Sequence, residues 1–308
     1  MDASLETLVV AAYVFACSLS IPRPGPVGLV TDQELIARAV AQAVTDLVSD
    51  RQFLGAVDRL LPGWFPHLPE QRQYNRRLRR LTPWIAAVRL QVSELIAEGE
   101  IRLVDGTLIS CANYPRCARR SEFGGHASYG YCPSKSLFVW GMRLVLIIDI
   151  NGAPVGHELV GAKTGEEREA AFQLATTHPH RSRFADCGFW GSEYDRAMEL
   201  IDVKLITPNK HRLGQRPPSE IANARIRLRD RKRLQQLKTT DATEPAPRQT
   251  VGGLAQRIAQ RLLAPTLGML ISHPTGRPPR ALAAYHGRWT HIKPLDAGRA
   301  GTLSARTM

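Results

Sequence analysis

Cysteines are few in this sequence: its 308 residues include five, at irregular spacing. Such a set is too small for a disulfide framework in a chain of this length, so we expect reduced thiols and a cytoplasmic protein. Long apolar runs are also absent. The run over residues 8–17 is too short to cross a bilayer, and acidic Asp2 and Glu6 precede it where a signal peptide carries basic residues. The run over 137–150 contains Arg143. We therefore predict no membrane partner.

Acidic residues are outnumbered, with 28 Asp and Glu against 41 Lys and Arg and a formal net charge of +13. This excess of basic residues predicts a polyanionic partner, nucleic acid ahead of a membrane surface. A glycine-rich phosphate loop is missing, so no nucleotide cofactor is predicted. Apolar residues make up 44% of the chain, which is ordinary for a globular protein, and the length favours two lobes over one core.

Residues 1–98 are predicted to form a helical DNA-binding region. Thr31 and Glu34 have the spacing of a capping box, at the start of a helix with one apolar face. Further along, arginines crowd into one helical segment that contains no acidic residue. A solvated helix face and a DNA contact account for this cluster about equally well. The arginines concerned are Arg72, Arg76, Arg77, Arg79 and Arg80.

After residue 99 the pattern predicts three strands, a helix, a strand, a helix and a strand. Asn151-Gly152 separates the second and third strands and is a strong hairpin signal. Thr164 and Glu167 have the spacing of a second capping box, and residues 110–134 are expected to be a long loop. The predicted fold class is α/β, with a mixed five-stranded sheet, flanking helices and a preceding all-helical region.

Two carboxylates lie inside otherwise apolar strands, Asp105 in Leu-Val-Asp-Gly-Thr and Asp186 in Phe-Ala-Asp-Cys-Gly. A buried carboxylate needs a partner, a metal or an exposed position. If the two strands are adjacent, both side chains can bind one cation, and carboxylates with open water positions suit Mg²⁺. The alternative is that one acid caps a turn and the other pairs with an arginine. Asp149, next to Asn151-Gly152, is interpreted as a turn residue.

An ordered set of short motifs resembles the bacterial insertion-sequence transposases of the DDE class. The motifs are VDGT at 104–107, CAR at 117–119, GYC at 130–132, WGMRL at 140–144, PVG at 154–156, GAK at 161–163, ERE at 167–169, ADCGFWG at 185–191, RIAQRLLA at 257–264 and RALAAY at 280–285. The resemblance implies an RNase H-like catalytic domain over residues 99–272, with a basic insert at about 209–250. A Pro/Arg/Gly-rich tail follows at 273–308.

The resemblance also implies that Asp105 and Asp186 are the first two acids of a site for two Mg²⁺ (or Mn²⁺) ions. The third acid of the family is normally Glu, and the matching position here falls at or beside Asp230, whose side chain is one methylene shorter. Three activities stay open. The chain is an active transposase, a catalytically impaired remnant that only binds DNA, or an RNase H-like nuclease that cleaves without joining.

The implied partner is double-stranded DNA, both the terminal repeats of the element and the target, bound by at least a dimer in the bacterial cytoplasm at the nucleoid. Basic residues near the expected strand ends are candidates for phosphate contacts, although each is also explained as ordinary surface charge. These candidates are Lys135, Arg143, Lys163, Lys210 and Arg212.

Overall fold

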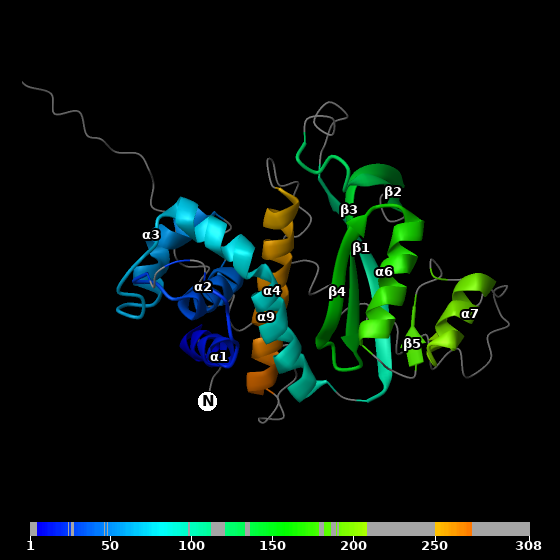
Figure 1. Cartoon of the computed structure of the whole chain (residues 1–308), viewed down its shortest axis with the longest axis horizontal. Helices are drawn as coiled ribbons and strands as arrows, with labels where there is room; N and C mark the ends of the chain where they lie inside the picture. The colour runs from blue at the N-terminus through cyan, green and yellow to red at the C-terminus, as the bar shows by residue number, and fades with distance from the viewer. Residues whose placement is uncertain are drawn as a thin grey trace, which may run out of the picture.

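The structure, a computed structural model, describes residues 5–23, 25, 28–45, 47, 49–97, 99–111, 121–132, 136–178, 182–185, 189, 191–207 and 250–272. Helices and a six-stranded sheet make up this part of the chain, so the fold is mixed α/β as predicted (Figure 1). The helices are α1 (Leu5–Cys17), α2 (Asp32–Val44), α3 (Asp50–Leu60), α4 (Gln71–Ile96), α6 (Thr164–Thr177), α7 (Ser192–Leu200) and α9 (Val251–Ser272). The strands are β1 (Ile101–Ser110), β2 (Ser128–Cys132), β3 (Leu137–Asp149), β4 (Pro154–Gly161), β5 (Ser182–Phe184) and β6 (Lys204–Ile206).

Helix α2 begins where the sequence predicts. At the start of α2, the backbone N–H of Glu34 donates to Thr31 Oγ1 at 3.1 Å, and the backbone N–H of Thr31 donates to Glu34 Oε2 at 2.7 Å. The predicted capping box is therefore confirmed. Helix α4 continues through Pro83 as one helix of 26 residues, although a proline removes one helical hydrogen bond. Its buried positions recur at three- and four-residue intervals, which fits burial of one long face.

Strand β3 is the central strand of the sheet. It pairs antiparallel with β1, β2 and β4, while β1 continues through parallel pairs to β5 and then β6. A tight turn joins β3 to β4, in which Asp149 Oδ1 accepts the backbone N–H groups of Asn151 at 2.9 Å and Ala153 at 2.7 Å. Gly152 has a φ of +93°, a conformation that glycine adopts without steric cost. The predicted hairpin and the turn role of Asp149 are confirmed.

The prediction of five strands is wrong, because residues expected to lie in a loop form β2. This strand pairs with the first residues of β3, from Ser128 opposite Gly141 to Cys132 opposite Leu137. Gly130 makes the pairing possible, since a β-carbon at this position would collide with the carbonyl oxygen of Ala162. A single glycine between two tyrosines was too weak a signal for a strand.

Helix α9 lies beside α4, between the N-terminal helices and the sheet (Figure 1). Leu263 and Leu267 belong to the core of the N-terminal helices, whereas Leu254, Ile258 and Leu262 pack on the sheet. The opposite face of the sheet is covered by α6. Helix α9 begins about 45 residues after the end of β6, and it contributes to the cores of both the N-terminal helices and the sheet. Among the described residues, no helix is both long and apolar enough to cross a membrane.

Candidate functional site

Asp105 lies in the middle of β1, on the sheet face that packs against α9. Side chains alternate between the two faces of a strand, and Leu103 and Ile109 both belong to the core on the α9 side. Asp105 shares their face and lies opposite Leu146 of β3, which belongs to the same core. The side chain of Asp105 is half-buried. A carboxylate thus occupies an apolar sheet face, as the sequence predicted.

Strand β5 is the parallel neighbour of β1 on the edge that β3 leaves open. In the register of this pair, Ile101 lies opposite Ser182 and Leu103 lies opposite Phe184. Asp186, the second predicted acid, lies outside the described residues. In the sequence it follows Phe184 by two positions, just as Asp105 follows Leu103. The two strands that lead to the predicted acids are therefore adjacent, parallel and in matching register.

The described residues hold one of the three predicted metal ligands, because Asp230 also lies outside them. Within this part of the chain, no group of three or more His, Cys, Asp or Glu side chains is arranged to hold a metal ion. Helix α9, which covers the face of Asp105, contains neither Asp nor Glu between Val251 and Ser272. Any third carboxylate must therefore come from another segment.

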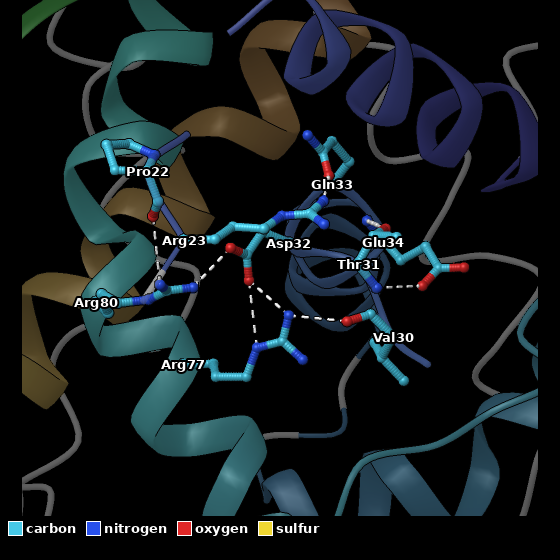
Figure 2. Close-up of polar contacts among 9 residues, drawn as sticks. All are labelled: Pro22, Arg23, Val30, Thr31, Asp32, Gln33, Glu34, Arg77 and Arg80. Carbon is cyan, nitrogen blue, oxygen red and sulfur yellow. Dashed lines mark hydrogen bonds and ion pairs between the residues drawn. The ribbon is translucent and has the colours of Figure 1, made fainter. Parts of the chain in front are cut away.

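Two of the five arginines predicted to bind DNA form ion pairs inside the protein. Arg77 and Arg80 reach from α4 to Asp32, in the first turn of α2, and each places a guanidinium nitrogen 2.6 Å from a different carboxylate oxygen (Figure 2). Arg77 also donates to the carbonyl oxygen of Val30 at 2.9 Å. Asp32 is 1% exposed. These two arginines fix the start of α2 against α4.

The remaining three arginines, Arg72, Arg76 and Arg79, are exposed. Of the predicted phosphate contacts near the sheet, Arg143 is ion-paired with Glu167 of α6 and largely buried. Lys163 is exposed at the start of α6. Lys135, Lys210 and Arg212 lie outside the described residues. Exposed positive charge is thus present on α4 and at the start of α6.

The predicted capping box of α6 is wrong. Lys163 rather than Thr164 is the N-cap residue, and Lys163 makes no side-chain cap hydrogen bond. Glu167, expected to reach back to the N-cap backbone, instead binds Arg143 on the neighbouring strand. Gly106 leaves space for this pair, because a β-carbon there would collide with the Glu167 carboxylate. A charged pair between strand and helix is stronger than a cap bond to a neutral backbone group, which explains the difference.

Sequence reasoning missed a buried polar cluster between α4 and β4. Arg89, 4% exposed, donates through Nη1 to the carbonyl oxygen of Pro154, and Ser93 Oγ donates to the same oxygen at 2.6 Å. His157 of β4 lies near Arg89. Burial, with smaller contributions from the positive charges of Arg89 and His178, lowers the pKa of His157 to about 3. The imidazole is therefore neutral at pH 7. No local pattern marks Arg89 as buried, because its neighbours are 65 positions away.

No protein-family model matches the chain, and no curated protein matches it either. The resemblance to DDE transposases therefore rests on the ordered motifs in the sequence. The position of Asp105 and the register of β1 and β5 are the structural observations that bear on it.

Proposed function

We propose that this chain is a DDE transposase, which cleaves DNA at the ends of its own insertion sequence and joins them to target DNA. The observation that carries the proposal is the register of the two strands that lead to Asp105 and Asp186. Leu103 and Phe184 are direct neighbours on parallel strands, and each acid is two residues further along. Equal steps along adjacent parallel strands bring side chains to the same level and face of a sheet.

The topology of the sheet supports an RNase H-like core for this enzyme. Strands β1, β3 and β4 form an antiparallel series, after which the chain crosses through α6 to β5 and through α7 to β6, both parallel to β1. This is the order of three strands, helix, strand, helix and strand that the sequence predicts for residues after 99. The short β2 is an addition beside β4 and leaves that order intact.

The donor groups fit Mg²⁺ or Mn²⁺. Asp105, Asp186 and Asp230 offer only carboxylate oxygens, the ligands that hard divalent cations prefer. Two such ions, when bound, activate the attacking oxygen and stabilise the leaving one in an in-line displacement. Asp105 lies in the part of β1 that pairs with β3, directly opposite Leu146, and this pairing holds the backbone that carries its carboxylate. Water attacks the phosphodiester at the element end, which releases a 3′-hydroxyl and a 5′-phosphate. The 3′-hydroxyl then attacks a phosphodiester of the target, which joins the two strands and releases a 3′-hydroxyl of the target.

The protein must also hold a highly charged substrate. Its net charge of +13 favours DNA through counterion release, and the exposed Arg72, Arg76 and Arg79 on α4 are available for phosphate contacts. Lys163 is exposed near the sheet. We propose that these residues bind the terminal repeats and the target, that the protein acts as a dimer on DNA, and that it does so at the bacterial nucleoid.

The test is cleavage and joining of a supercoiled plasmid that carries the gene with its natural flanking DNA, in Mg²⁺ and in EDTA. We expect Mg²⁺-dependent nicks at the element ends, followed by joined products, and loss of both in Asp105→Ala. Glu158→Ala, which removes an exposed acid from β4, is the matched control and should keep full activity.

Two outcomes would replace the proposal. Wild-type protein that binds the ends but cleaves no better than Asp105→Ala would be a DNA-binding remnant. Cleavage that depends on Asp105 but never yields joined products, even with an excess of target DNA, would identify a nuclease.

A further inference from the structure

The β2–β3 hairpin carries three exposed aromatic side chains. Tyr129 is 55% exposed, Tyr131 is 48% exposed and Phe138 is 71% exposed. The rings of Tyr131 and Phe138 contact each other, with centroids 5.2 Å apart and planes tilted by 55°. Large aromatic side chains are normally buried in a monomer, and a group of them on the surface usually marks a binding site. We call these three residues the aromatic hairpin face.

The aromatic hairpin face belongs to the same side of the sheet as Asp105. Tyr131 lies opposite Phe138, Tyr129 lies opposite Trp140, and Asp105 lies opposite Leu146. Positions 138, 140, 142, 144 and 146 of β3 alternate onto one face. Eight residues of strand separate the level of Phe138 from that of Asp105, a distance of about 26 Å at roughly 3.3 Å per residue. Between these two levels the face is buried under α9, so the aromatic hairpin face is an exposed surface separate from Asp105.

The charge around the aromatic hairpin face suits a polyanion. Residues 123–148 include no Asp or Glu. Lys163 is exposed beside the first residue of β2, and its backbone N–H donates to Ser128 Oγ at 3.1 Å. Aromatic rings beside positive charge are what unpaired nucleic acid requires, because each base has a flat face that stacks and each phosphate needs a cation. Protein interfaces are also rich in aromatic residues, so it is the lack of acidic residues and the exposed Lys163 that favour nucleic acid over a protein partner.

We infer that the aromatic hairpin face stacks unpaired bases of DNA. The inference rests on the proposed function, because it takes DNA as the ligand. It goes further by naming a subsite that selects unpaired over paired bases. Stacking requires a flat ring, whereas hydrophobic docking requires only apolar area. This difference allows the two to be separated by substitution.

The experiment is fluorescence anisotropy of the full chain in EDTA, where binding is measured without chemistry. The probes are a labelled duplex with a single-stranded 3′ extension and a blunt duplex of the same paired sequence. Phe138→Leu and Tyr131→Leu keep an apolar side chain but lose the ring. We expect each to weaken binding of the extended duplex about tenfold, the scale of one base–aromatic stack, with no change for the blunt duplex. Phe138→Trp should keep the affinity.

Leu137→Ala is the control, because Leu137 is exposed and adjacent but faces the other side of the strand. Circular dichroism shows whether each variant is folded. Unchanged binding in both leucine variants, or an equal loss on the blunt duplex, would overturn the inference. A change in self-association instead of DNA affinity would also overturn it and would identify a protein interface. Ring-dependent binding in a chain that never cleaves would refute the proposed function while leaving this subsite supported.

Discussion

Leu103 lies directly opposite Phe184 on the adjacent parallel strands β1 and β5. This pair joins the antiparallel part of the sheet to its parallel part. Each of the two residues precedes a predicted catalytic acid by two positions. If the two acids bind the same divalent ions, as proposed, then the losses of activity caused by replacing each acid must be coupled.

The first prediction is that Asp105→Ala and Asp186→Ala are not additive. Each substitution should lower Mg²⁺-dependent cleavage by about a thousandfold, because a lost ligand removes several kcal/mol of transition-state stabilisation. The double variant should be no worse than either single one, since residues that act as one unit fail together. Initial rates on the plasmid substrate measure this. Multiplicative losses would show that the two acids do not serve one site.

The second prediction concerns the ion pairs of Asp32. Asp32→Asn should lower the free energy of unfolding by about 2–3 kcal/mol, because Arg77 and Arg80 lose a buried partner. The loss falls at the lower end of the range for buried pairs, since both arginines are partly exposed and can turn to water. Urea denaturation measures it. Asp58→Asn, which changes an exposed acid on α3, is the control; equal effects of the two substitutions would contradict the prediction.

The third prediction separates the arginines of α4 by role. Alanine at Arg72, Arg76 or Arg79 should leave stability unchanged. It should make the negative slope of log affinity against log salt shallower by about 0.9 per lost phosphate contact. Arg77→Ala should instead destabilise the fold through Asp32. DNA binding at several salt concentrations, with thermal melting in parallel, tests both statements. Slopes that stay at the wild-type value in all three exposed variants would exclude this part of α4 as a DNA contact.

The fourth prediction is a loss of stability in acid that depends on His157. Its pKa is about 3 in the folded protein and about 6.5 in an unfolded chain. Between these values the unfolded state binds the additional proton, so the free energy of unfolding decreases as pH falls below about 6.5. The contribution is at most about 1.4 kcal/mol per pH unit.

His157→Gln should flatten this pH dependence, whereas His126→Gln, at an exposed position, should not. Urea denaturation between pH 7 and pH 4 supplies the two profiles. Identical slopes for wild type and His157→Gln would show that the imidazole is not kept neutral by its surroundings.

Local signals in the sequence were sufficient for most of the elements. The capping box at Thr31 and the Asn151-Gly152 turn each depend on residues within four positions of one another, and the structure contains both. The apolar setting of Asp105 was also readable, because strand alternation is a local pattern. These features required no knowledge of which segments meet in space.

Contacts between distant segments could not be predicted in this way. Arg77 meets Asp32 across 45 positions, and Arg89 meets Pro154 across 65. From sequence alone, a paired arginine and a DNA-binding arginine on the same helix are indistinguishable. The strand β2 was missed for a related reason, since Gly130 is explained only by its close approach to Ala162.

The position of α9 has a consequence for the gene. Its residues 251–272 complete the packing of both the N-terminal helices and the sheet. A stop codon or frameshift between codons 207 and 251 would therefore expose apolar surface of both the N-terminal helices and the sheet in the translated product. Late truncations should be degraded as readily as early ones, and a shortened copy would not persist as a dominant-negative inhibitor of the intact protein.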